Sequence, residues 1–349
     1  MHCDNTVHVY RGTAPRYDAV LLSITERCHV GCAHCGFIGT KREREATLDE
    51  LRQWTGQLCE YGIPRLILTG GEPFERLDAM EIAVRTAASR IPIVATFTSS
   101  FWGTSQAEAR YVLRQLAGLN QLYLSTDAFH QQRVPFENVH NVIDAALAEG
   151  LPYITLCITY SNDLELADVK AHYARWGSTV TFHEDRVIPT PYLSRRVMER
   201  QASGVAVSSS HYGRTCYLQT PLINPNGDLY ACHSGKAAAH RAFTDSPYFL
   251  GNLREKTFAE IVHLASRRWD YQYLRTQGPK GVAELVERSP AVLHEVGRTE
   301  FTTACDMCFS ILKTHAGTEA LRVQVHRPEV QDSVNIRLAI GLGEDPITE

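Results

Sequence analysis

Runs of Val, Ile, Leu and Thr alternate with amphipathic stretches through the first half of the chain. Each run is bounded by turn or breaker residues and predicts a β-strand. The predicted strands are Asp18–Thr25, Arg65–Thr69, Ile93–Thr98, Gln121–Thr126, Tyr153–Ser161 and Thr179–His183. The stretches between them carry apolar residues at helical spacing and predict helices. These helices are Thr47–Tyr61, Leu77–Ala88, Ser105–Gly118, Val139–Glu149 and Glu165–Trp176.

The order of these elements predicts the fold class. Because strands and helices alternate, we expect parallel strands joined by right-handed crossovers. We therefore predict an α/β fold, a partial (β/α)6 barrel of parallel strands, with a doubly wound sheet as the alternative. Thr47 stands three residues before Glu50, the spacing of a helix capping box, and Gly150 follows the fourth predicted helix.

The alternating pattern ends near Pro189–Ser210, where prolines, a glycine and a run of serines predict a boundary. Beyond it, Asn224–Asp228 has the composition of a hairpin turn. The turn joins two short predicted strands, Thr220–Ile223 and Leu229–Cys232. Phe258–Arg268 then predicts a helix.

Near the end of the chain, Ser333–Ile340 is predicted to form a further strand. Together these patterns predict four segments. They are an N-terminal extension (1–17), the partial barrel (18–200), a small cysteine-rich α+β domain (201–315) and a C-terminal tail (316–349).

Composition narrows the class of protein. The 349 residues are 44% hydrophobic and 21% charged, as in an ordinary folded protein. The formal net charge of −4 counts against a nucleic-acid partner, because such binders usually carry a basic excess. No apolar stretch reaches the roughly 18 residues that a membrane helix needs. Met1–Asn5 has neither the basic start nor the apolar core of a signal peptide, so we expect a cytoplasmic protein without membrane contact.

The chain contains ten cysteines, and disulfides are not expected in a reducing cytosol. Seven of them fall into two groups with ligand-like spacing: Cys28, Cys32 and Cys35 in the first, and Cys216, Cys232, Cys305 and Cys308 in the second. Thiolates select iron–sulfur clusters, zinc or copper(I). Three thiolates leave one iron of a cubane open, whereas four close a site, so we expect one open and one closed cluster.

The first cysteine group follows the first predicted strand, and a Gly-Gly-Glu-Pro segment from Gly70 to Pro73 ends the second. In β/α folds the chemistry lies at the carboxyl ends of the strands. The glycines allow a ligand to approach the backbone, and Glu72 offers a carboxylate to an amino group. These two motifs resemble those of the radical S-adenosylmethionine (SAM) superfamily.

The resemblance implies specific roles for these residues. In that family the three cysteines hold a [4Fe–4S] cluster whose open iron chelates SAM, and the Gly-Gly-Glu segment hydrogen-bonds the SAM amino group. It thus implies cluster ligands at Cys28, Cys32 and Cys35, and SAM contacts at Gly70, Gly71 and Glu72. The residue before the third cysteine is usually aromatic and packs on the adenine; here it is His34, whose flat imidazole can stack in the same way. Ser99 and Ser125 at strand ends are weaker SAM contacts. A zinc knuckle beside a glycine turn is the alternative.

The second group resembles the SPASM/twitch extension of radical SAM enzymes. The likeness rests on Cys216-x10-Gly227-x4-Cys232 followed by Cys305-x2-Cys308. Because no further cysteine follows Cys308, the shorter twitch form is the better match. The resemblance implies a second, auxiliary [4Fe–4S] cluster, and a structural zinc site with four thiolates remains the alternative.

Three further residues are candidates for catalysis. Period-two alternation puts Cys157 on the mixed face of its strand, where its thiol could give a hydrogen atom to a substrate radical. A small core residue is the other interpretation. Asp127 and His130 follow the fourth predicted strand and could accept a proton. Helix capping and a structural histidine are their alternatives.

The resemblance implies an enzyme that reductively cleaves SAM and abstracts a substrate hydrogen with a 5′-deoxyadenosyl radical. We expect it to oxidise, cross-link or epimerise a ribosomal peptide precursor in natural-product biosynthesis. The alternatives are an epimerase or dehydrogenase of a sugar or aminocyclitol, and a non-catalytic iron–sulfur or zinc accessory protein. Expected partners are a flavodoxin or ferredoxin electron donor and, since only 27 residues precede Cys28, a separate leader-peptide-binding protein.

Overall fold

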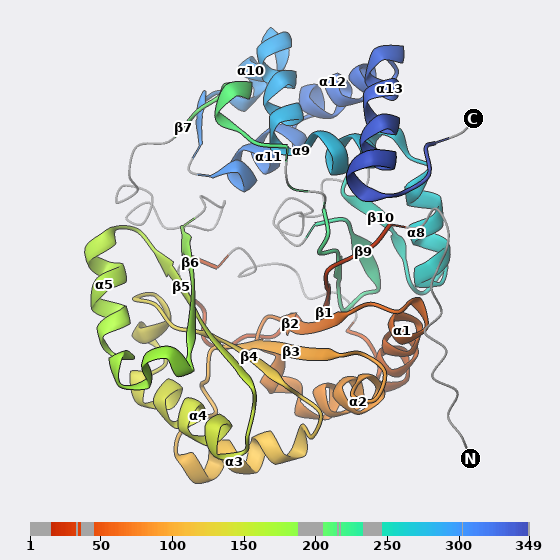
Figure 1. Cartoon of the computed structure of the whole chain (residues 1–349). Helices are drawn as coiled ribbons and strands as arrows, with labels where there is room; N and C mark the ends of the chain where they lie inside the picture. The colour runs from red at the N-terminus through yellow and green to blue at the C-terminus, as the bar shows by residue number, and fades with distance from the viewer. Residues whose placement is uncertain are drawn as a thin grey trace, which may run out of the picture.

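Parallel strands form the barrel half of the molecule, as the alternating pattern predicts. The structure is a computed structural model that describes residues 15–32, 34–35, 45–187, 205–214, 216, 218–232, 246–301 and 303–347. The strands are β1 (Val20–Thr25), β2 (Arg65–Gly70), β3 (Ile93–Thr98), β4 (Gln121–Ser125), β5 (Tyr153–Tyr160) and β6 (Thr181–Arg186). Each pairs in parallel with the next. They curve as a partial barrel with helices on its outer side (Figure 1).

Helices cover the outer face of these strands, and the first four of them are amphipathic. They are α1 (Leu48–Tyr61), α2 (Leu77–Ala87), α3 (Gln106–Gln115), α4 (Phe136–Ala148) and α5 (Asp163–Ala171). Because alternate strand residues point to one face, Leu22, Leu66 and Val94 are fully buried in the core beneath the helices. Thr47 and Glu50 form the predicted capping box at the start of α1.

The sheet continues beyond β1 into the second half of the chain. β8 (Leu222–Ile223) pairs in parallel with β1. β9 (Asp228–Tyr230) and β10 (Phe249–Asn252) follow in antiparallel order, and β8 with β9 confirms the predicted hairpin. Across the described chain the order is β10-β9-β8-β1-β2-β3-β4-β5-β6. Arg254, just after β10, pairs with Glu50 of α1 at 2.7 Å and fastens this extension to the barrel.

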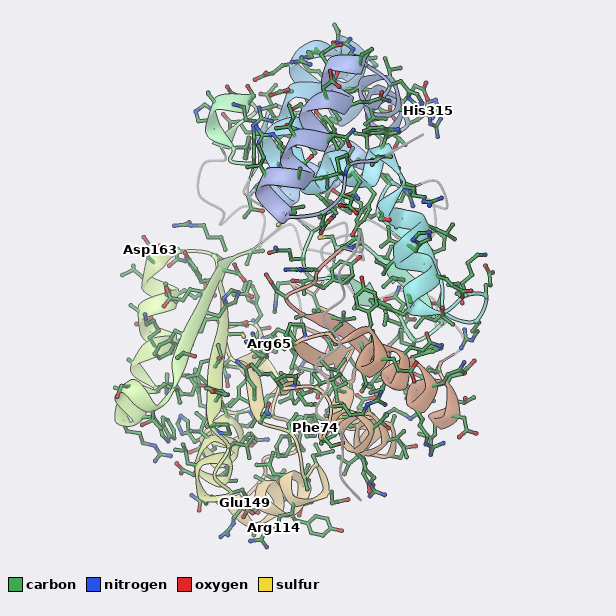
Figure 2. All side chains as sticks on the ribbon, turned by 45° about the vertical axis from the view of Figure 1, so that its right-hand side comes forward. Arg65, Phe74, Arg114, Glu149, Asp163 and His315 are labelled. Carbon is green, nitrogen blue, oxygen red and sulfur yellow. The ribbon has the colours of Figure 1, made fainter. Side chains whose placement is uncertain are left out.

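A second core of helices follows the sheet. Helix α8 (Phe258–Ser266) still packs on α1, and its Phe258, Ile261 and Val262 belong to the barrel core. The second core contains α9 (Trp269–Arg288), α10 (Pro290–Val296), α11 (Ala304–Leu312), α12 (His315–Val325), α13 (Pro328–Arg337), the π-helical turn η5 (Leu338–Leu342) and the paired strands β7 (Val205–Ala206) and β11 (Glu300–Phe301). The helix predicted at Phe258–Arg268 is confirmed as α8. The other helices pack around α9, which kinks at Gly278 before Pro279. Figure 2 shows His315 in this part of the molecule and Phe74 in the barrel.

The strand predicted at Ser333–Ile340 is wrong, because these residues are helical in α13 and η5. Val334 and Leu338, four positions apart, are fully buried, whereas Ile336 and Ile340 are 59% and 83% exposed. The buried residues therefore follow helical rather than period-two spacing. The segment predicted as a tail contains α12 and α13, whose apolar side chains join the second core.

A buried ion pair joins α9 to the last described segment. The guanidinium of Arg275, 1% exposed, donates to the carboxylate of Glu344 at 2.6 and 2.7 Å. Glu344 also accepts from the backbone nitrogen of Arg16 at 3.3 Å. The hydroxyl of Tyr17 bonds that of Tyr271 at 2.9 Å. The segment before β1, helix α9 and the last segment therefore meet at one buried polar contact.

Some predicted features lie outside the described residues. These are the N-terminal extension up to residue 14 and most of the boundary at Pro189–Ser210. The segment limits stay predictions. Among the helices that the structure describes, none combines the length and the apolar character needed to cross a membrane.

Candidate functional site

The loop that leads to Cys28 lies directly against the end of β2. The backbone nitrogen of Gly71 donates to the Thr25 oxygen at 2.7 Å. A Cβ atom on Gly71 would lie 2.1 Å from the Arg27 oxygen, and one on Gly70, which has φ of 146°, would lie 2.3 Å from the Thr25 oxygen. Only glycine permits this approach. Gly70 and Gly71 thus allow the loop that leads to Cys28 to pack directly on the end of β2. This is a structural role beside the ligand contact predicted from the sequence.

Glu72 is 1% exposed, and its carboxylate accepts hydrogen bonds from two neighbouring segments. The donors are Phe74 N at 3.2 Å, Thr98 Oγ1 at 2.9 Å, Ser99 N at 2.8 Å and Ser99 Oγ at 2.6 Å. Burial raises the pKa of Glu72, while these hydrogen bonds act in the opposite direction. The carboxylate therefore joins the ends of β2 and β3, and Ser99 contributes both of its donors to it. Contact of either residue with SAM stays a prediction.

The first cysteine group lies in one loop after β1. Cys28 is exposed, Cys35 is half-buried, and Cys32 is buried against Val30 and Val134. The backbone nitrogen of Cys35 donates to the Cys32 oxygen at 3.0 Å, which turns the chain between these two ligands. Partial burial of its sulfur raises the pKa of Cys28 to about 11, and Cys35 adds to this effect. The structure therefore places the three cysteines in one loop at the carboxyl end of β1.

Asp127, 1% exposed, is the centre of a polar cluster after β4. Its Oδ2 lies 2.9 Å from Nδ1 of His130 and 4.0 Å from Nε2 of His34. Its Oδ1 accepts from the backbone nitrogens of Phe129 and His130, each at 2.9 Å. Thr159 N donates to Oδ2 at 3.3 Å. One ligand atom from each of Asp127, His34 and His130 lies within 4.8 Å of the others, an arrangement that suits a cation as well as a proton.

The two imidazoles of this cluster respond differently to their surroundings. Burial lowers the pKa of His34 to about 4. Burial also acts to lower the pKa of His130, but the Asp127 carboxylate outweighs it and raises the value to about 10. The Cys32 side chain also acts to raise the pKa of His130. The Asp127–His130 pair therefore lies near the first cysteine group.

Several buried polar atoms in this half have no hydrogen-bond partner among the described residues, and two of them lie in the first cysteine loop and just after β3. They are Nδ1 of His34 and Oγ of Ser100. Ser100 follows β3 with φ of 66°, a conformation that is uncommon outside glycine. An unpaired buried polar group costs about 1–3 kcal/mol, so a polar ligand that pairs with it is favoured. Three thiols beside such atoms fit an iron–sulfur cluster with a polar ligand next to it.

Ser125 and Cys157 are register partners on β4 and β5, and both are half-buried. Burial raises the pKa of Cys157 to about 12, and the carboxylates of Asp185 and Asp127 add to this effect. The thiol therefore keeps its proton at neutral pH. It lies on the same side of the sheet as the Asp127 cluster, close enough to feel that carboxylate.

The second cysteine group gathers between the hairpin and α11. Cys232 follows β9, Cys305 and Cys308 lie in the first turns of α11, and Cys216 lies in the loop before β8. The pKa of Cys308 is raised by burial and by the other three thiols, so the four side chains lie close together. The buried phenol of Tyr248 adjoins the same four sulfurs, which add to the effect of burial in raising its pKa.

The kink of α9 holds the loop of Cys216. The backbone nitrogen of Lys280 donates to the Gly213 oxygen at 3.1 Å. A Cβ atom on Gly278, where φ is 56°, would lie 2.6 Å from the Arg214 oxygen. The glycine at the kink therefore lets α9 approach the segment that positions Cys216.

Asp306, between the two cysteines of α11, is a fully buried carboxylate that the sequence analysis missed. Arg298 donates to its two oxygens at 2.6 and 3.2 Å, and also to Ser310 Oγ at 2.6 Å. Thr303 caps the helix by accepting from Asp306 N at 3.0 Å. An acidic residue in the first turn after a threonine was the available signal. The clamp fixes the Cys-x-x-Cys turn, and a set of four thiols suits either a closed cluster or zinc.

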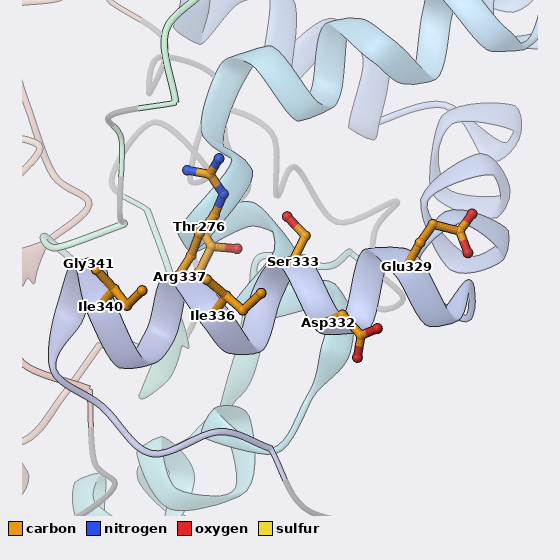
Figure 3. Close-up of a pocket in the computed structure, with 8 residues that line it drawn as sticks. All are labelled: Thr276, Glu329, Asp332, Ser333, Ile336, Arg337, Ile340 and Gly341. Atoms are coloured by element: carbon orange, nitrogen blue, oxygen red, sulfur yellow. The ribbon is translucent and has the colours of Figure 1, made fainter.

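A groove of about 540 Å³ runs along α13 (Figure 3). None of the candidate residues named above lines it. Its lining consists of Thr276, Glu329, Asp332, Ser333, Ile336, Arg337, Ile340 and Gly341.

Comparison with known proteins bears on the barrel half. The sequence profile of the radical SAM superfamily matches residues 22–174. GTP 3′,8-cyclase of Listeria welshimeri is 30% identical over 122 residues, which span 34% of this chain and 35% of that protein. GTP 3′,8-cyclase of Lactiplantibacillus plantarum is 31% identical over 174 residues, which span 46% and 51%. The chain thus matches about half or less of the length of these relatives.

Solved structures share a broader but weaker likeness. A structure described as native anSMEcpe with bound AdoMet and Cp18Cys peptide superposes with a TM-score of 0.49 at 10% identity. The superposition covers 87% of this chain and 98% of that chain.

Proposed function

Residues 22–174 belong to the radical SAM superfamily, and on this premise we propose that the chain is an enzyme that modifies C–H bonds. Membership implies a [4Fe–4S] cluster and SAM. We assign the cluster to Cys28, Cys32 and Cys35, and the observation that carries the assignment is their position in one loop at the carboxyl end of β1. When bound, the cluster and SAM supply a 5′-deoxyadenosyl radical, which takes a hydrogen atom from the substrate.

The residues at the ends of β2, β3 and β4 would bind and orient SAM. Nδ1 of His34 and Oγ of Ser100 are buried donors or acceptors without a partner in the described chain, and a polar cofactor can satisfy them. The backbone of Gly70 and Gly71 lies beside the same loop. Glu72 and Ser99 contribute by fixing these strand ends, and Ser125 is the further contact on β4.

We assign an auxiliary [4Fe–4S] cluster to the second cysteine group. Support comes from the close approach of four thiols, two of them in a helix turn that Arg298 and Asp306 clamp. Full ligation leaves no open iron for a substrate, so the group would serve as an electron relay or a structural staple. Measuring the iron and zinc content of the protein distinguishes an iron–sulfur cluster at this site from a zinc ion.

The substrate we propose is a ribosomal peptide precursor, with a sugar or aminocyclitol as the alternative. The resemblance of the second cysteine group to the SPASM/twitch extension supports this class. A protonated Cys157 thiol can quench a substrate radical: its S–H bond breaks, a C–H bond forms, and one electron and one proton restore the thiol. A flavodoxin or ferredoxin would supply the electron, and a separate leader-binding protein would present the peptide.

Anaerobic reconstitution tests the proposal. With dithionite and SAM, the protein should hold about eight irons per chain as two cubanes and release 5′-deoxyadenosine. Cys28→Ala should lose the product and about four irons. Cys59→Ala is the matched control, because that thiol is on the buried face of α1, in the barrel core, and donates to the Thr86 oxygen at 3.7 Å. Absence of both SAM cleavage and clusters would leave the accessory-protein alternative.

A second candidate is cyclisation of GTP, favoured by the matches to proteins named GTP 3′,8-cyclase. The same assay with GTP as the only substrate decides this point. A new product at the expense of GTP would favour the candidate, whereas unchanged GTP beside continued SAM cleavage would exclude it.

A further inference from the structure

We propose that β6 (Thr181–Arg186) binds an extended peptide as an additional strand, so that alternate side chains of the peptide face the barrel interior beside Cys157. The inference rests on the peptide substrate of the proposed function and names the surface that would present it. β6 is the last strand of the nine-stranded sheet (Figure 1). Among the described residues only β5 pairs with it, so one edge of β6 is open there to backbone pairing.

One hydrogen bond at the end of β6 shows which backbone groups point to the open edge. The backbone nitrogen of Val187 donates to the Tyr160 oxygen of β5 at 3.1 Å. Because successive residues of a strand direct their backbone groups to opposite sides, those of Phe182, Glu184 and Arg186 point away from β5. None of these groups is paired within the described ranges. An added strand can satisfy this row of N–H and C=O groups.

The side chains of β6 extend a row across the inner face of the barrel. His183 is the register partner of Cys157, which is in turn the partner of Ser125. These side chains face inward, because Ile158 and its alternate neighbours on β5 pack in the core beneath the helices. Asp185 is on the same face, with its carboxylate 2.8 Å from Nε2 of His183. A strand added about 4.8 Å beyond β6 would continue the row with every second side chain.

The charges on β6 indicate which peptides fit. On the outer face, Glu184 pairs with Lys170 at 2.6 Å and Arg186 with Asp163 at 3.1 Å, so these charges are compensated by α5. On the inner face, the Asp185 side chain is 66% exposed. Opposite charges on facing strands stabilise their pairing, so we expect a basic residue of the peptide to face Asp185. Charged side chains also restrain two copies of such an edge from pairing with each other.

Strand addition separates the peptide substrate from the sugar or aminocyclitol alternative. Only a polypeptide offers donors and acceptors that repeat at the spacing of a strand. β6 has six residues, and at about 3.3 Å per residue it would pair with a peptide segment of similar length. Backbone pairing would supply affinity, and the side chains that face the barrel would supply specificity.

The test removes one backbone donor at the open edge. Glu184→Pro deletes an N–H group that points away from β5, and proline is tolerated at such a position of an edge strand. Glu184→Ala is the matched control, because it removes the same side chain and keeps the N–H group. The probe is a decapeptide enriched by mRNA display from a random library against the reconstituted full chain with SAM. The readouts are the dissociation constant, from fluorescence anisotropy, and hydrogen–deuterium exchange of the β6 amides.

We expect Glu184→Ala to bind the decapeptide like the unchanged protein, and Glu184→Pro to bind it roughly tenfold more weakly. In the unchanged protein, the peptide should slow exchange of the β6 amides. N-methylation along the peptide should weaken binding at every second residue, a result that does not depend on how well Glu184→Pro folds.

Equal affinity of two folded variants, unchanged exchange in β6 or an N-methylation scan without period two would overturn the inference, as would a library that yields no binder. Protection of β6 that rises with protein concentration in the absence of peptide would identify a second copy as the occupant and would also overturn it. Failure of the proposed function would look different, because 5′-deoxyadenosine would not be released although the peptide still bound.

Discussion

Ser99 donates two hydrogen bonds to Oε2 of Glu72, one from its backbone nitrogen at 2.8 Å and one from its hydroxyl at 2.6 Å. These bonds cross from the end of β3 to the segment after β2. Glu72 N also donates to the Arg27 oxygen at 2.7 Å, so a continuous series of hydrogen bonds links the end of β3 to the loop that carries Cys28. The carboxylate is thus part of the frame of the site.

Replacing Glu72 should therefore destabilise the fold before it affects any ligand. Glu72→Gln leaves a buried NH2 group facing donors, and we expect the free energy of unfolding to fall by about 2–3 kcal/mol. Ser99→Ala should lower it by about 1–2 kcal/mol, since the backbone donor remains. Urea unfolding measures both. A Glu72→Gln protein with native stability but no SAM binding would show that the carboxylate serves the ligand alone.

A methyl group at Gly71 should displace the first cysteine loop. The new Cβ would lie 2.1 Å from a backbone oxygen, which cannot yield without moving the chain before Cys28. We expect Gly71→Ala to lose iron at the first site while iron at the second remains. Gly56→Ala is the control, because a Cβ there meets nothing within 4 Å and should stabilise α1 by roughly 0.5–1 kcal/mol. Equal iron in both variants would contradict this account.

Cys157 should resist alkylation in the folded protein. A pKa raised to about 12 keeps almost all of the thiol protonated at pH 8, and the thiolate is the reactive form. At pH 8, iodoacetamide should therefore leave Cys157 unmodified, and peptide mass mapping reads this directly. Denatured protein labels fully and provides the control. Rapid labelling of Cys157 in the native state would show that its surroundings favour the thiolate.

The buried pair of Arg275 and Glu344 should behave asymmetrically under substitution. Arg275→Met leaves an unpaired buried carboxylate, and we expect a loss of about 3–5 kcal/mol in the free energy of unfolding. Replacing both residues, with Glu344→Leu added, should recover part of the loss because no charge then remains buried. Denaturant unfolding of the single and double variants gives the comparison. A double variant less stable than Arg275→Met would contradict it.

The barrel was predictable because each element has a clear local period. Along β5, Ile154, Leu156 and Ile158 are buried and alternate with less buried positions, as the period-two pattern predicts. In α13 the sequence fits two periods, since apolar residues recur at every second position from Val334 to Ile340. In the structure Val334 and Leu338, four positions apart, pack in the second core, and this packing stabilises the helix rather than a strand. Helix α9 escaped prediction because Gly278 and Pro279 interrupt it, and the tertiary contact with the Cys216 loop outweighs their local cost.

For the candidate site, the sequence predicted the types of ligand and the strand ends at which they lie. It could do so because the spacing of the cysteines and the glycine pair involves residues that are close in the sequence. The partners of Glu72 are on another strand, 26 and 27 residues away. Likewise, the approach of His34 to Asp127 depends on how the loop after β1 lies against the end of β4. Roles that arise from such distant contacts require the folded structure.

The parallel pairing of β8 with β1 has a consequence for any attempt to divide the protein. Leu21 N donates to the Pro221 oxygen at 2.9 Å, and Asp18 N to the Gln219 oxygen at 3.0 Å. A fragment that stops after β6 would leave these backbone groups without hydrogen-bond partners, so β1 would become an exposed and largely apolar edge strand. Such an edge recruits further strands and promotes aggregation. Grafting this barrel onto another partner module therefore requires a substitute strand that shields β1.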